Sequence, residues 1–224
     1  MTQNEHHQDL AHIRGLMERS TRFLSLSGLS GVCAGVVALM GALLARERYD
    51  ALLLGAAPAR SRSLDGGHDA YTGPEVMDAA WDLVPLALLV LLLALAGAAW
   101  FTWRRARRMG QRLWDPSAKR LAWNLAVPLV AGGLFCLAML GHGHVALVAP
   151  ATLVFYGLAL LNASKYTLDE IRWLGLSEVV LGLISTVWVG AGLLFWALGF
   201  GVLHILYGSL MWMRHERGTT SSSR

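Results

Sequence analysis

The sequence predicts an all-α, polytopic membrane protein, and three observations lead to this fold class. The chain has 224 residues, of which 55% are hydrophobic and 15% are charged, whereas a soluble domain carries about 25% charged residues. Several stretches exceed the roughly 18 apolar residues that mark a membrane-spanning helix. Lys and Arg gather at the ends of these stretches, as they do beside a membrane surface.

The apolar stretches predict a bundle of six transmembrane helices. Their approximate ranges are 23–45, 83–103, 120–141, 144–162, 174–197 and 199–213. With the N-terminus inside, 15 of the 19 Lys and Arg residues fall on the cytoplasmic side. Because cytoplasmic segments are enriched in Lys and Arg, we expect both termini in the cytoplasm. A multi-pass protein of the bacterial inner (cytoplasmic) membrane is therefore predicted.

The chain divides into three parts around this bundle. Residues 1–22 carry Leu10, Ile13 and Met17 at helical spacing, which predicts an amphipathic cytoplasmic helix. The transmembrane domain covers 23–213 and includes an outer loop at 46–82 and a basic cytoplasmic loop at 104–120. Residues 214–224 are predicted to form a flexible cytoplasmic tail.

The sixth predicted span is unusually short. Its 15 residues, 199–213, would cover about 22 Å of a hydrocarbon core that is about 30 Å thick. Two explanations stay open: the helix lies in a thinned region among other helices, or the turn at Gly199–Gly201 enters the membrane. A turn inside the membrane requires protein or water around its backbone.

Small residues recur along the first span. Ser27, Gly31 and Gly35 are spaced four residues apart and lie on one face of the helix. Because burying leucine gains little in lipid, membrane helices associate through such small residues. We expect this face to pack against a neighbouring helix of the same chain; an oligomer interface is the alternative.

Two ionisable side chains within the spans are the leading candidates for a functional site, because charge inside a membrane is costly. They are Glu178 and His204, with Tyr207 one turn further and Asn124 as another polar group. Counting helical rise places Glu178 and His204 at similar depths on consecutive antiparallel helices. Their contact would suit a proton relay or ligand site. Otherwise Glu178 snorkels to the cytoplasm or caps a helix, and His204 is a packing residue.

Two histidines interrupt the apolar pattern at Gly141-His142-Gly143-His144. The glycines favour a tight outer turn between the third and fourth spans. His142 and His144 are weak candidates for a metal site, because a transition metal needs three or four ligands. We therefore predict no cofactor, with a transition metal or haem as the alternative.

The remaining motifs exclude several functions. No phosphate-binding loop, HExxH, CxxC or nucleophile elbow occurs, so we do not expect an enzyme. The basic residues cluster at the span ends, which argues against nucleic-acid binding. One cluster forms a candidate face for anionic lipid or a protein partner, and its members are Arg104, Arg105, Arg107, Arg108 and Arg112.

Two stretches, 13–35 and 156–183, resemble a group of small uncharacterised bacterial polytopic inner-membrane proteins with no established activity. The resemblance therefore transfers no functional residue. We expect a non-enzymatic regulatory or accessory subunit that contacts a protein partner, or another copy of itself, through its cytoplasmic face. The alternatives are a small transporter or channel with a polar path at Glu178 and His204, and a metal- or haem-binding sensor.

Overall fold

The computed structural model describes residues 26–62, 74–110, 114 and 116–217. This part of the chain is helical and contains no strand. The α-helices are α2 (Gly28–Arg62), α3 (Pro74–Arg108), α4 (Pro116–Gly141), α5 (Val148–Ala163), α6 (Asp169–Val187), α7 (Gly192–Trp196) and α8 (His204–His215). A π-helix, η5 (Ala197–Leu203), joins α7 to α8 into one continuous rod.

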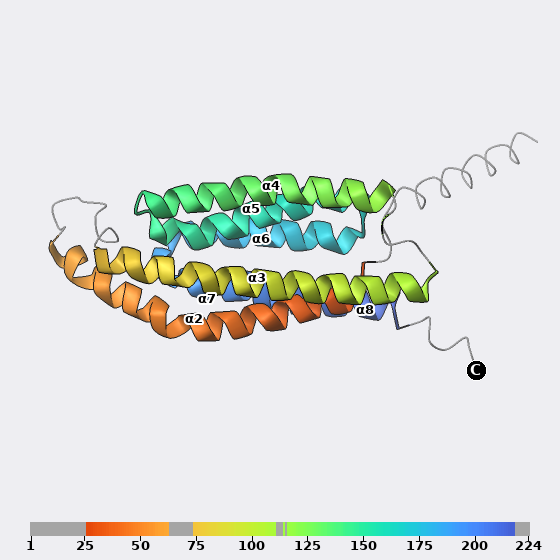
Figure 1. Ribbon diagram of the computed structural model, residues 1–224, viewed down its shortest axis with the longest axis horizontal. Coiled ribbons are helices and arrows are strands. Elements are labelled where there is room, and N and C mark those ends of the chain that lie inside the picture. The colour runs from red at the N-terminus through yellow and green to blue at the C-terminus, as the bar shows by residue number, and fades with distance from the viewer. Residues whose placement is uncertain (1–25, 63–73, 111–113, 115, 218–224) are drawn as a thin grey trace, which may run out of the picture.

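The helices form two layers (Figure 1). Helices α4, α5 and α6 make one layer, and α2, α3 and the α7–η5–α8 rod make the other. In the first layer α5 packs against both α4 and α6. In the second layer α2 packs against both α3 and the α7–η5–α8 rod. We call the end where α3 and α8 finish and α4 and α6 begin the basic end, since Arg105, Arg107 and Arg108 lie in the last turn of α3.

Five helical segments are long and apolar enough to cross a membrane, so the chain is a multi-pass membrane protein. They are Gly28–Asp50, Ala80–Arg108, Pro116–Gly141, Val145–Tyr166 and Gly192–His215. Helix α6 lies beside them and has 19 residues, but its first turns carry several charges. A sixth crossing and the cytoplasmic position of both termini stay predictions.

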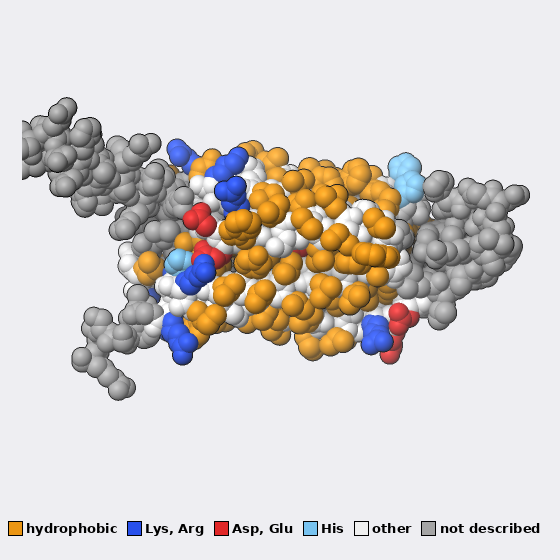
Figure 2. All heavy atoms as spheres, turned by 180° about the vertical axis from the view of Figure 1, so that it is seen from behind, with side chains coloured by type: hydrophobic (Ala, Val, Ile, Leu, Met, Phe, Trp, Pro, Cys, Tyr) orange, Lys and Arg blue, Asp and Glu red, His pale blue; other side chains and the backbone are white. Residues whose placement is uncertain are grey.

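Apolar side chains cover the middle of the surface, and charged side chains gather toward its ends (Figure 2). Many large apolar side chains are exposed there, including Leu92 at 63% and Leu134 at 64%. Such a surface suits lipid, because a soluble protein rarely exposes a continuous apolar band. The predicted N-terminal helix, 1–22, and most of the tail, 214–224, lie outside the described residues.

The predicted outer loop at 46–82 is largely helical in the structure. Helix α2 continues to Arg62 and α3 begins at Pro74. Residues 46–54 include three Leu and two Arg, which have high helix propensity. Arg46 and Asp50 also form an i,i+4 ion pair at 3.8 Å, which supports a helix here.

The predicted boundary between the fifth and sixth spans is wrong. Helix α6 ends at Val187, and the chain turns at 188–191 rather than at Gly199–Gly201. Both glycines lie inside the π-helix η5. The final rod therefore runs from Gly192 to His215 and is 24 residues long. Its length matches a bilayer, so neither explanation for a short span is needed.

Helices α2 and α8 approach closely through glycine. A Cβ atom on Gly31 would lie 3.1 Å from the Gly208 Cα, and one on Gly208 would lie 2.7 Å from the Gly28 carbonyl oxygen. Gly35 faces the Gly201 carbonyl oxygen in the same way. Gly31 and Gly35 thus pack within the chain, on the side of α2 that faces η5 and α8.

Candidate functional site: a buried glutamate, histidine and tyrosine

The candidate site lies between the two layers and is centred on Glu178. This residue is in the middle of α6, and its side chain is fully buried. Neither carboxyl oxygen of Glu178 has a hydrogen-bond partner among the described residues. His204 is an ionisable neighbour, and its Nδ1 lies 3.4 Å from Glu178 Oε1. A buried carboxyl group with so few partners is costly and is therefore a functional candidate.

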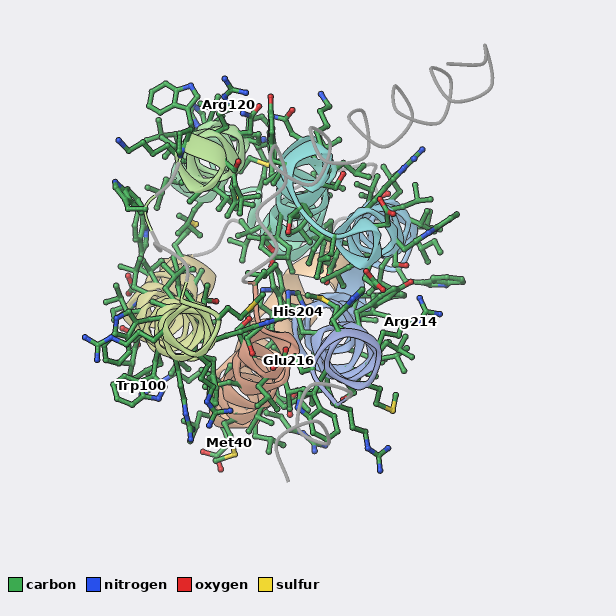
Figure 3. The ribbon with its side chains drawn as sticks, turned by 90° about the vertical axis from the view of Figure 1, so that its right-hand side faces the viewer. Met40, Trp100, Arg120, His204, Arg214 and Glu216 are labelled. Carbon is green, nitrogen blue, oxygen red and sulfur yellow. The ribbon has the colours of Figure 1, made fainter. Side chains whose placement is uncertain are left out.

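His204 comes from the other layer, at the first position of α8, and is also buried. Figure 3 shows His204 inside the ring of helices when the bundle is seen from its basic end. Its Nε2 lies 2.7 Å from the Tyr156 hydroxyl oxygen, and its Nδ1 lies 3.1 Å from the Gly199 carbonyl oxygen. Both ring nitrogens thus have partners.

The π-helix explains why Glu178 fits against this rod. Gly199 lies in η5, and a Cβ atom there would collide with Glu178 Oε2 and with Leu153. The backbone of Gly199 therefore forms one wall of the site, where only glycine leaves room. Single π-helical turns within α-helices are frequent at functional sites.

Aromatic rings pack beside the site. The Tyr156 ring lies 4.9 Å from the Phe200 ring, and the Phe200 ring stacks on the His204 ring at 6.0 Å. These contacts fix the Tyr156 and His204 rings, so their hydrogen bond keeps a defined geometry.

Apolar side chains lie on both sides of the site along the bundle axis. Leu153, which is fully buried, packs between Gly182 and Gly199 away from the basic end. Toward the basic end lies an apolar cluster made by Leu160, Leu168, Ile171, Leu174 and Met211. The polar groups are thus enclosed by hydrocarbon, where a charge has few compensating partners.

The structure brings Glu178 and His204 together, as their depths suggested, whereas Tyr207 and Asn124 make their hydrogen bonds with other residues. The Tyr207 hydroxyl is 3.3 Å from Ser177 Oγ, one turn closer to the basic end. Asn124 lies on α4 and donates to the Arg120 carbonyl oxygen at 2.8 Å. Its amide group thus bonds within its own helix and makes no hydrogen bond to Glu178.

His142 and His144 occupy the turn after α4. Both are exposed, and Gly143 between them has a φ of 81°, which suits glycine in a tight turn. His142 Nδ1 lies 2.7 Å from the Ala138 carbonyl oxygen. The described residues contain no cluster of three or more His, Cys, Asp or Glu side chains that could bind one metal ion.

The basic end contains a second polar cluster, which joins three helices. Arg105 turns inward from α3 and pairs with Glu216 at 3.2 Å, with side-chain exposures of 12% and 15%. Glu216 also accepts hydrogen bonds from the Gly28 N–H at 2.6 Å and from Ser27 Oγ at 3.2 Å. The assignment of Arg105 to an exposed binding face is thus wrong, because it neutralises Glu216.

Ser27 precedes the first residue of α2 and is buried. Its hydroxyl donates to Glu216, a bond that its predicted packing role did not anticipate. Arg104, Arg107 and Arg108 are exposed, as the predicted face requires. Arg107 also lies over the Trp103 ring, 4.3 Å from its centroid. Arg112 lies outside the described residues.

A third cluster joins the start of α6 to the end of α8. Glu170 Oε1 lies 3.3 Å from Arg214 Nη1 and 3.1 Å from His215 Nε2. Burial alone would raise the pKa of Glu170, but its own backbone N–H together with His215 and Arg214 lowers the pKa below its usual value. This carboxylate therefore stabilises the fold above its unfolded pKa, and the contribution is lost as the pH falls through the lowered value.

Sequence reasoning missed Tyr156 and Glu216. A signal for Tyr156 exists, because a tyrosine within an apolar span needs a partner for its hydroxyl group. Glu216 follows the last helix and looks like an ordinary surface residue in the sequence. Only the return of α8 to the start of α2 shows its role.

Comparison with known proteins finds no matching family model, no matching curated protein and no matching solved structure. The resemblance to small bacterial inner-membrane proteins therefore stays a prediction.

Proposed function

We propose that this chain is a non-enzymatic membrane protein that serves as a regulatory or accessory subunit in the bacterial inner membrane. It contacts its partner through the basic end, which we place in the cytoplasm. The proposal rests on the different directions of the arginine side chains of α3. Arg105 points inward and pairs with Glu216, whereas its neighbours Arg104, Arg107 and Arg108 are exposed.

This arrangement supports a binding surface because the exposed arginines are mounted on a fixed helix end. Arg105 and Glu216 hold the end of α3 against the start of α2, and Glu170 ties the start of α6 to the end of α8. A rigid scaffold lowers the entropy that its partner must overcome on binding. Exposed arginines recognise carboxylates and phosphates with paired hydrogen bonds.

Co-purification from the native membrane in mild detergent tests this proposal. We compare the unchanged chain with Arg107→Gln/Arg108→Gln, and with Arg46→Gln/Arg48→Gln as a control. The control also removes two positive charges from exposed arginines, but these lie where the apolar segment of α2 ends, at the opposite end of the bundle from the basic end. We expect one protein to co-purify in stoichiometric amount with the unchanged chain. Its amount should fall at least tenfold with Arg107→Gln/Arg108→Gln and stay the same with the control.

Two results would overturn the proposal. In one, the two variants retain equal amounts of the co-purifying protein. In the other, the chain purifies without a stoichiometric protein, and Arg107→Gln/Arg108→Gln lowers its binding to vesicles that contain anionic lipid. The second result would assign the arginines to lipid, where each is worth about 1 kcal/mol near the surface. A chain that purifies as a homo-oligomer would identify the partner as another copy.

A second candidate function, a small transporter or channel, is favoured by the buried contact between Glu178 and His204. Buried ionisable groups are typical of ion pathways in membranes. The apolar packing on both sides of this contact argues for the accessory role instead. Proton or solute flux into liposomes distinguishes the two. A flux that Glu178→Gln abolishes, with protein yield unchanged, would establish transport.

A metal- or haem-binding sensor, the remaining alternative, has little support in the geometry. Both ring nitrogens of His204 already have partners, Tyr156 and the Gly199 carbonyl oxygen. Metal analysis and an absorption spectrum of the purified protein check this role directly.

A further inference from the structure

We infer that Glu178, His204 and Tyr156 form a binding site for one proton, which the cluster holds as the carboxylic acid of Glu178 beside a neutral His204. The site lies between the two helix layers: α6 and α5 supply Glu178 and Tyr156, and α8 supplies His204. This inference is independent of partner binding at the basic end.

The hydrogen bonds of His204 indicate its protonation state. The Gly199 carbonyl oxygen can only accept, so His204 Nδ1, 3.1 Å away, carries a hydrogen and donates it. The Tyr156 hydroxyl, 2.7 Å from Nε2, is satisfied when it donates its hydrogen to that nitrogen. With the hydrogen on Nδ1 alone, the imidazole is neutral and both of its nitrogens are paired.

The surroundings of Glu178 indicate where the remaining proton lies. Its two carboxyl oxygens are buried without a hydrogen bond, and Oε2 faces the Gly199 backbone. A carboxylate in such a place would lose its hydration without compensation, whereas the neutral acid loses far less. If His204 is neutral, the Glu178 carboxyl group must therefore be protonated to avoid an isolated buried charge.

The elements packed around the site supply few other charges. Helix α5 presents Tyr156, η5 presents the Gly199 carbonyl oxygen and α8 presents His204. On the side of α2 that meets η5 and α8 lie Gly31 and Gly35. Among the described residues, Glu178 and His204 are thus the ionisable pair that sets the charge at this interface, and Tyr156 is their polar partner.

Loss of the proton would therefore alter how the two layers meet. Release to water leaves a negative charge on Glu178 against the Gly199 backbone, and the His204 Nδ1–H, 3.4 Å away, is directed at the Gly199 carbonyl oxygen. Recovery of solvation requires His204 to turn from Gly199 toward Glu178, or α6 to move from η5. Occupancy by one proton thus favours the closed interface that the structure shows.

Infrared spectroscopy of the full-length chain in liposomes at neutral pH tests the inference. The probe is the C=O stretching band of a protonated carboxyl group, identified by its shift in D2O. We expect this band in the unchanged chain and in Glu170→Gln, and its loss in Glu178→Gln. Glu170 is the matched control because its carboxylate pairs with Arg214 and His215.

A second measurement keeps the test valid if Glu178→Gln does not fold. Nitrogen-15 NMR of labelled histidine in the unchanged chain should show a neutral imidazole with its proton on Nδ1, and His204→Gln should remove that signal. His204→Gln should also shift the carboxyl band without abolishing it. The inference is overturned if the unchanged chain lacks the band, if Glu178→Gln keeps it, or if His204 is an imidazolium.

Discussion

Gly208 of α8 allows this helix to pack closely against α2. Its Cα faces Gly31, and a Cβ atom there would lie 2.7 Å from both the Gly28 carbonyl oxygen and the Val32 nitrogen. Backbone atoms cannot move aside as the tip of a side chain can. Gly208→Ala should therefore push α8 away from α2 and lower the free energy of unfolding by about 1–3 kcal/mol, as overpacking does.

Thermal unfolding in detergent measures this effect, and Gly133→Ala is its control. Gly133 lies in α4, and a Cβ atom added there would meet no neighbouring atom within 4 Å. Alanine has the higher helix propensity by about 1 kcal/mol, so this variant should be neutral or more stable. Equal melting temperatures for Gly208→Ala and the unchanged chain would contradict the close contact.

At the residue scale, sequence reasoning works where one physical rule acts alone. The cost of charge in a membrane singles out Glu178 and His204, and helical rise places them at similar depth. The same rule overvalues Asn124, whose side chain bonds to the backbone of its own helix. The rule also does not predict which way the Arg105 side chain points. That side chain points inward because the segment after α8 places Glu216 beside it.

At the scale of elements, the start of α2 depends on the chain segment that follows α8. Glu216 accepts a hydrogen bond from the Gly28 N–H and pairs with Arg105 of α3. A carboxylate is favourable at a helix N-terminus, where backbone N–H groups lack partners within the helix. One carboxyl group thus serves as a cap for α2 and as a link among α2, α3 and α8.

Glu216→Ala should lower the free energy of unfolding by about 1.5–3 kcal/mol, because it leaves Arg105 and the Gly28 N–H without this partner. Thermal or denaturant unfolding in detergent gives the value. Asp50→Ala is the comparison, since the Arg46–Asp50 pair is exposed at 72% and 56%. An exposed pair is worth less than about 1 kcal/mol, so losses of equal size would argue against the role of Glu216.

Element boundaries were predictable where a local signal marks them. Pro116 opens α4 after Asp115, as the preference for proline at the first helical position implies. The boundary between α6 and α7 was not predictable, because Gly199 and Gly201 form a sequence pattern that is typical of a turn. Their small size serves contacts with Glu178 and Leu39 instead. The sequence contains the glycines but not the partners that require them.

At the scale of the whole molecule, the fold class was predictable because composition alone limits it. Apolar stretches of this length form helices in lipid, since every backbone group must find a partner within the segment. The division into two layers depends on which helices touch, and hydropathy carries no such information. The positive-inside pattern predicts orientation, which a labelling experiment can decide.

We expect the basic end to face the cytoplasm. Cysteine is placed at Met109, which is 46% exposed at this end, or at exposed His142 in the opposite turn, with Cys33 and Cys136 replaced by Ala. A membrane-impermeant maleimide should label His142→Cys in intact spheroplasts and Met109→Cys only after lysis. The reverse pattern would invert the topology and place the exposed arginines on the other side.

The unequal lengths of the helices have a consequence beyond the bilayer. Helix α2 continues for 12 residues past Asp50, where its apolar segment ends, a distance of about 18 Å. The headgroup layer is only about 5–8 Å deep on each side. Figure 1 shows α2 and the start of α3 protruding past the turn after α4. The end of α2 and the start of α3 thus extend beyond the lipid surface. An antibody would reach an epitope tag inserted between these two helices without disturbing the buried Glu178 and His204.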